Sequence, residues 1–250
     1  MLALVSTLLF ALTILVNALA NILPINGLNT GEVSALYPSL FTPAGLTFSI
    51  WSIIYLLLFG FIILHWLKPD SFVLLEVSRL FWLSCILNVS WILAWHYLLT
   101  AISVTLMLLL LLTLLQLYLK IKKVAVLNRA ERLLVKLPFT LYFAWISVAT
   151  IANISAYLVS IGWEGGMISP VMWTFIMMGI AVILAGWISL RFKEPTYALV
   201  VVWALFGIFW RYQEEANASL SMVSLGYMLI LLAWTVVVVI KIINSKKVSY

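Results

Sequence analysis

Charged residues are scarce in this sequence, and that scarcity defines the class of protein. Only 9% of the 250 residues are charged, whereas 66% are hydrophobic and the mean hydropathy is +1.20. Soluble globular domains have about a quarter charged residues and about half apolar ones. The composition therefore excludes a soluble domain and predicts a polytopic membrane protein.

The residues that usually build catalytic and metal sites are also scarce. Cys85 is the one cysteine, which excludes a disulfide framework and a thiolate metal site. His65 and His96 are the two histidines, and the predicted helices place them at separate depths. We therefore expect no catalytic residues, no metal site and no required cofactor, and the sequence argues against an enzyme. His96 is interpreted as a hydrogen-bonding residue at the membrane interface, with haem ligation as the alternative.

The net charge of +6 raises the question of nucleic acid, but the basic residues occupy short loops between hydrophobic runs. Such loops orient a membrane protein against the cytoplasmic face, so we expect no nucleic-acid partner. The runs are continuously apolar, without the alternation of membrane strands. The fold class is therefore all-α: a polytopic transmembrane helical bundle.

The hydrophobic runs predict about eight helices, since one span needs about 20 apolar residues. Their expected ranges are 3–23, 46–67, 80–99, 102–121, 137–161, 170–190, 197–210 and 220–243. The range 197–210 is short and is read either as a full span or as a re-entrant segment. Eight spans place every Lys and Arg except Arg211 on one side. This predicts a multi-pass protein of the plasma (inner) membrane with both termini cytoplasmic, and outer loops at 24–44, 162–169 and 211–219.

No charged residue is expected in a helix interior, which argues against an ion pump or a retinal protein. The chemistry must instead come from aromatic and amide side chains. Trp51 and Tyr55 follow the loop residues Pro43 and Gly45, and their i, i+4 spacing places both on one helix face, where a flat ligand could lie.

Two other helices repeat the combination of amide and aromatic side chains. Helix lengths predict that Asn88, Trp91 and Asn153 lie at the depth of Tyr55, in a cavity in the outer half of the membrane, with Trp145 deeper. Interhelical packing through amide hydrogen bonds is the alternative interpretation. The candidate ligand-binding residues are Trp51, Tyr55, Asn88, Trp91, Trp95, Tyr142, Trp145 and Asn153.

Three patterns resemble, in order, those of the tryptophan-rich sensory protein family, also called the translocator protein or peripheral benzodiazepine receptor family. They are the proline-led Trp51-x-x-x-Tyr55, Leu87-Asn88-x-x-Trp91, and Tyr142-x-x-Trp145 followed by Ala149-Thr150 and Asn153. A single Pro43 stands where the family has paired prolines, and Leu141 replaces a proline beside the tyrosine. The resemblance covers a five-helix core at 1–161, and 162–250 is predicted to be an additional three-helix membrane extension.

The resemblance implies a membrane binding protein or sensor for planar hydrophobic ligands. Porphyrin or haem are the foremost ligands of such proteins, with sterols in some members. A small-molecule transporter and a light-dependent porphyrin-degrading enzyme are the alternatives. The implied partners are the lipid bilayer and a hydrophobic small molecule, and a homodimer is left open. Nothing in the residues names the ligand.

Overall fold

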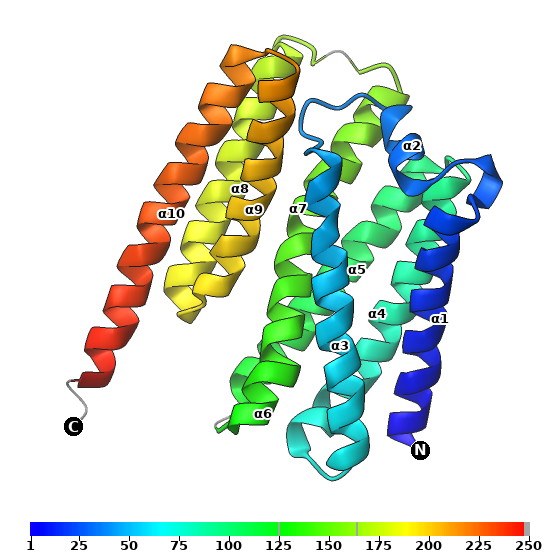
Figure 1. Cartoon of the computed structure of the whole chain (residues 1–250), viewed down its shortest axis with the longest axis vertical. Coiled ribbons are helices and arrows are strands. Elements are labelled where there is room, and N and C mark those ends of the chain that lie inside the picture. The colour runs from blue at the N-terminus through cyan, green and yellow to red at the C-terminus, as the bar shows by residue number, and fades with distance from the viewer. Residues whose placement is uncertain (125, 164, 248–250) are drawn as a thin grey trace. The chain divides into compact units, whose positions relative to one another are not determined.

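In the computed structural model the described residues form helices joined by turns and loops, with no strand among them (Figure 1). It describes residues 1–124, 126–163 and 165–247, so Glu164 in the predicted 162–169 loop lies outside the description, as do the side chains of Lys246 and Lys247. Within these residues, eight helices are long and apolar enough to cross a membrane. The predicted class of polytopic helical membrane protein is thus confirmed.

The chain forms two compact units. The five-helix unit comprises Met1–Pro38 and Ile50–Gly162, and the three-helix unit comprises Ser39–Ser49 and the chain from Trp163 onward. This division falls close to the predicted boundary after residue 161. It differs in one respect, because Ser39–Ser49, here called the strap, groups with the C-terminal helices. The chain therefore passes between the units three times.

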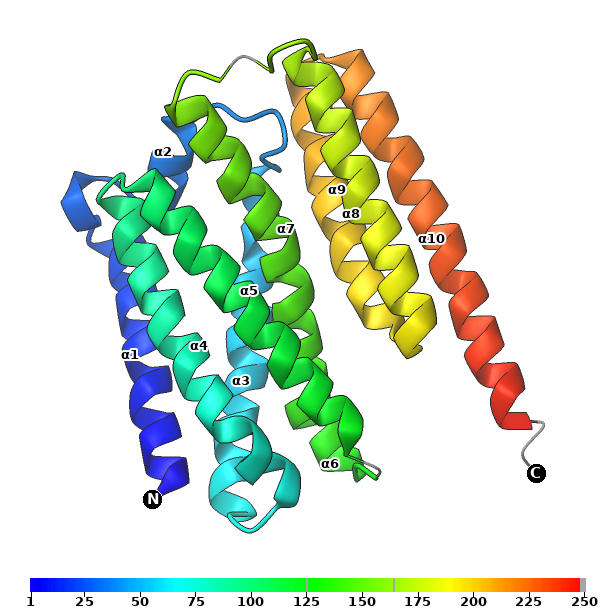
Figure 2. The ribbon, with the colours of Figure 1, turned by 180° about the vertical axis from the view of Figure 1, so that it is seen from behind.

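The five-helix unit consists of long helices joined by short connections. Its membrane-spanning helices are α1 (Leu2–Ile22), α3 (Ile50–Leu67), α4 (Phe72–His96), α5 (Thr100–Lys123) and α7 (Leu137–Ser160). Helices α4 and α5 form a tight hairpin, visible in Figure 2, with Leu98 at a positive φ of 59° in its turn. A short helix, α2 (Thr30–Ala35), lies in the long loop after α1 and is capped reciprocally by Asn29 and Glu32.

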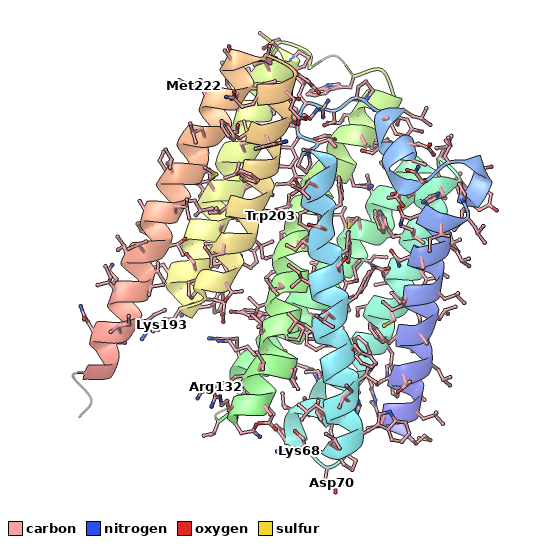
Figure 3. The ribbon with its side chains drawn as sticks, in the orientation of Figure 1. Lys68, Asp70, Arg132, Lys193, Trp203 and Met222 are labelled. Atoms are coloured by element: carbon pink, nitrogen blue, oxygen red, sulfur yellow. The ribbon has the colours of Figure 1, made fainter. Side chains whose placement is uncertain are left out.

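Helix α4 begins eight residues earlier than the sequence predicts. It therefore includes Glu76 and Arg79, which corrects the expectation that no charged residue lies within a helix. Glu76 Oε2 pairs with Lys120 Nζ at 3.0 Å, and both side chains are more than 40% exposed. Glutamate and arginine are good helix formers, and they are tolerated here because they lie in the first turns of the span. Lys68, Asp70 and Arg132 lie at the same end of the unit (Figure 3).

Helix α7 is preceded by a π-helical turn, Arg132–Lys136, which follows α6 (Arg129–Glu131). The Leu137 N–H bonds to the Arg132 carbonyl, five residues back. Pro138 comes next and cannot donate a backbone hydrogen bond. The π turn carries the helix past this proline, so that 129–160 forms one continuous apolar span.

The three-helix unit contains α8 (Pro170–Phe192), α9 (Pro195–Glu214) and α10 (Ala218–Lys247). The uncertain range 197–210 is thus part of a 20-residue helix. About 30 Å of helix is enough to cross the hydrocarbon layer. Trp234 Nε1 of α10 donates to the Gly186 carbonyl of α8 at 3.0 Å, which ties these two helices together. In Figure 3, Lys193 and Met222 mark opposite ends of this unit.

Candidate ligand-binding site

An aromatic cluster joins α3 and α7 in the five-helix unit. Trp51 stacks on Tyr55, with ring centroids 5.3 Å apart and planes at 22°. The Trp51 ring also meets Tyr142 at 5.7 Å and Trp145 at 6.4 Å, both edge to face. Tyr142 and Trp145 are buried, whereas Trp51 and Tyr55 are partly exposed. The cluster therefore presents one partly accessible stacked pair against a fixed aromatic wall.

The Asn88 amide connects this cluster to α1 and α4. Its Oδ1 accepts from Asn17 Nδ2 at 2.8 Å, and its Nδ2 donates to the Tyr142 hydroxyl at 3.0 Å. Asn88 is fully buried. The Tyr55 hydroxyl is buried and has no hydrogen-bond partner among the described residues. Because a buried amide needs partners at both ends, Asn88 fixes the relative positions of three helices.

A second aromatic group follows Asn88 along α4. Trp91 stacks on Trp95 at 6.5 Å with planes at 22°, and Trp95 meets Tyr37 of the long loop at 6.0 Å. Trp91 Nε1 is buried and has no hydrogen-bond partner among the described residues. Asn88, which contacts the first aromatic group, and Trp91, which begins the second, are one turn apart on α4. The two aromatic groups are therefore adjacent. The Trp91 indole N–H is thus a buried donor beside the Asn88 amide.

His96 holds the loop after α1 to the end of α4. Its Nδ1 lies 3.2 Å from the Ile25 carbonyl and its Nε2 lies 3.1 Å from the Thr30 hydroxyl. The His96 carbonyl accepts from Asn26 Nδ2 at 3.1 Å. A carbonyl can only accept, so Nδ1 carries the proton and Nε2 accepts from Thr30 when the ring is neutral. Both ring nitrogens are engaged, which supports the hydrogen-bonding interpretation over haem ligation.

The structure changes the expected depths of two candidate residues, Trp145 and Asn153. Tyr142 and Trp145 lie level with Trp51, whereas Asn153 exchanges hydrogen bonds with Ser103 in the first turn of α5. The depth estimate assumed that the helices end at one level, and α7 extends beyond α3. Thus Trp51, Tyr55, Asn88, Tyr142 and Trp145 come together, Trp91 and Trp95 adjoin them, and Asn153 lies apart.

Sequence reasoning found some of the supporting residues and missed others. Thr13, Asn17 and Asn21 lie four residues apart on α1 and form a polar stripe, which is expected to face protein. Asn17 does so through Asn88, whereas the exposed Asn21 side chain donates to the Asn17 carbonyl of its own helix. Tyr37 was not anticipated, since nothing in the sequence of a polar loop indicates that a tyrosine will fold back on Trp95. Trp203 has no amide residue at helical spacing that would mark it in the sequence, yet its indole donates to the strap.

The fold is that of a multi-pass membrane protein, with an aromatic cluster that joins α3 and α7. Its sequence matches the family described as TSPO-like protein over residues 3–240, and the chain belongs to that TSPO-like family. The match continues through the C-terminal helices, beyond the 1–161 range over which the motifs resemble the family. Comparison with curated proteins and with solved structures found no match.

Proposed function

We propose that the five-helix unit binds a planar hydrophobic ligand, of the porphyrin or haem class, against Trp51 and Tyr55. The observation that carries this proposal is the stacked pair itself, which is partly exposed and backed by the buried rings of Tyr142 and Trp145. Indole and phenol faces stack on a flat macrocycle with little loss of side-chain entropy. Membership of a family of membrane proteins that bind hydrophobic ligands supports the same assignment.

The polar groups near the rings fit a ligand that is mainly apolar and has a few polar substituents. Asn88 and Tyr142 satisfy one another, so they shape the site without demanding a ligand. The Trp91 indole N–H has no partner among the described residues and can donate to a ligand carboxylate or hydroxyl. A mostly apolar surface with few placed polar groups is typical of small-molecule sites.

Protoporphyrin IX should bind the purified protein in lipid nanodiscs, with a shifted Soret band and quenched tryptophan fluorescence. The double variant Trp51→Phe, Trp145→Phe should weaken binding by about tenfold, because two indole contacts are reduced. Trp187→Phe is the matched control, since Trp187 is exposed on α8 and packs edge to face against Phe192 of the same helix, outside the five-helix unit. An unshifted Soret band, or equal affinity in the double variant, contradicts the proposal.

Stacking rather than iron ligation should hold the macrocycle. We expect haem and metal-free protoporphyrin IX to bind with affinities within about threefold of each other, because both His96 nitrogens are already hydrogen-bonded. The visible spectrum of bound haem should lack the bands of histidine-ligated iron. Much tighter binding of haem, abolished in His96→Ala, would show that the ring leaves Thr30 to ligate the metal.

A further inference from the structure

The strap is bound to one face of α9 by a series of hydrogen bonds to its backbone. The Arg211 guanidinium donates to the Ser39 carbonyl at 3.2 Å and to the Thr42 carbonyl at 2.9 Å. The Tyr212 hydroxyl donates to the Leu40 carbonyl at 2.9 Å, and Trp203 Nε1 donates to the Thr47 carbonyl at 2.9 Å. In the opposite direction, the Ala44 N–H donates to the Gly207 carbonyl at 3.0 Å. Helix α9 thus binds the strap at four carbonyls and one amide.

These contacts supply hydrogen-bond donors to backbone carbonyls of the strap. The strap contains no Lys or Arg, and Phe41 and Thr47 are only 2% exposed. Buried backbone carbonyls need donors, and a charged guanidinium is a strong one. Arg211 is the basic residue that eight spans place on the outer side, against the general distribution of charge. Its contacts with the strap give a physical reason for that exception.

The packing of the strap on α9 is close as well as polar. A Cβ added at Gly207 would overlap the Thr47 hydroxyl and would lie 2.9 Å from the Pro43 Cβ. Only glycine lets the two backbones approach closely enough for the Ala44 to Gly207 hydrogen bond. The close packing at Gly207 therefore fixes the position of the strap on α9.

The strap continues directly into the helix that carries the stacked aromatic pair. Its last five residues, Gly45–Ser49, form a 3₁₀ turn, and α3 begins at Ile50, so Trp51 is the second residue of the helix. We propose that α9 is the anchor of this segment, and that Arg211, Trp203 and Gly207 act as positioning residues for Trp51. This inference rests on the proposed function of the aromatic site.

The 3₁₀ turn and α3 form one continuous helical segment, Gly45–Leu67, so the first turn of this segment, whose N–H groups have no partners within the helix, belongs to the strap. A strap bound to α9 suppresses fraying of that turn and keeps the next turn, which carries Trp51, helical before a ligand arrives. Preorganised groups bind more tightly, since less ordering occurs on binding. Release of the strap should thus weaken ligand binding without removing any residue that contacts the ligand.

The test compares Gly207→Ala with Gly226→Ala, whose added methyl meets no atom within 4 Å. Hydrogen exchange of the full chain in nanodiscs is followed in peptides covering 39–49 and 50–55, together with protoporphyrin IX affinity. In Gly207→Ala both peptides should exchange about tenfold faster and affinity should fall severalfold. Gly226→Ala should match the wild type in every measurement.

Arg211→Gln is a second and milder way to release the strap from α9, because it removes the charged donor without adding bulk. Glu215→Gln is its control, since the Glu215 carboxylate pairs with the Arg211 Nε at 2.8 Å and, as an acceptor, cannot donate to the strap carbonyls. Arg211→Gln should accelerate exchange in both peptides, and Glu215→Gln should leave them unchanged. This pair keeps the inference testable if Gly207→Ala does not fold.

The outcomes separate the inference from the proposed function. Wild-type protein that does not bind porphyrin refutes the proposed ligand, while exchange at 50–55 still tests the anchoring of α3. Faster exchange confined to 39–49, or unchanged exchange in both peptides, overturns the inference. Unchanged porphyrin affinity with both peptides released also overturns it, because Trp51 would then not depend on the strap.

Discussion

Phe61→Ala is expected to lower the free energy of unfolding by about 3 kcal/mol, a large effect for one side chain. Phe61 is fully buried, and its ring lies 4.9 Å from that of Phe81 and 5.1 Å from that of Phe139. It therefore joins α3 to α4 and α7. In a membrane the loss comes mainly from packing, because lipid tails are as apolar as the protein core. Unfolding in mixed detergent micelles would measure it.

Phe59→Ala is the matched control for this prediction. Phe59 lies two residues away on the same helix but is 53% exposed. Truncating a side chain on the exposed surface of the unit should change the unfolding free energy by no more than about 0.5 kcal/mol. Equal losses in the two variants would mean that the three-phenylalanine cluster is not the packing centre of the unit.

Asn88→Leu is expected to lower the free energy of unfolding by about 2 kcal/mol and to weaken porphyrin binding. The change removes hydrogen bonds to α1 and α7 and leaves the buried Tyr142 hydroxyl without its amide partner. Unfolding in mixed micelles gives the stability, and the Soret shift gives the affinity. Both should fall together, because the same amide holds the helices and aligns the aromatic wall.

Two comparisons sharpen this second prediction. Asn21→Leu replaces an exposed amide that bonds only to its own helix, and it should leave both quantities near their wild-type values. A double-mutant cycle with Tyr142→Phe isolates the Asn88 to Tyr142 hydrogen bond, since each single variant removes it. Additive losses in that cycle would show that the bond contributes nothing beyond its two separate side chains.

Hydropathy predicted the eight spans but placed some of their ends too far inside, as α9 shows. Tyr197 to Trp210 looks short because Pro195 and the Arg211-Tyr-Gln-Glu214 segment are counted as loop, yet all of them are helical. Proline is favoured in the first turn of a helix, and polar residues are tolerated at its end. The same reasoning explains why Glu76 and Arg79 were missed at the start of α4.

Spacing along single helices predicted the aromatic site only in part. It correctly grouped Trp51 with Tyr55 on one face. It could not align α7 with α3, because relative depth depends on where each helix ends, and so it placed Trp145 too deep and Asn153 at the level of Tyr55. Contacts made by loops, such as Tyr37 on Trp95, follow from tertiary packing and leave no periodic signal.

The strap has a consequence for the order in which the protein matures during synthesis. Its hydrogen bonds to Trp203, Arg211 and Tyr212 join residues 156 to 172 positions apart. At about 5–20 residues per second, a ribosome needs roughly 8–35 s to make that intervening chain. Helix α3 therefore enters the membrane well before its anchor exists. The nascent protein must pass through a stage with Trp51 on an untethered helix, and the strap can settle only after α9 has been inserted.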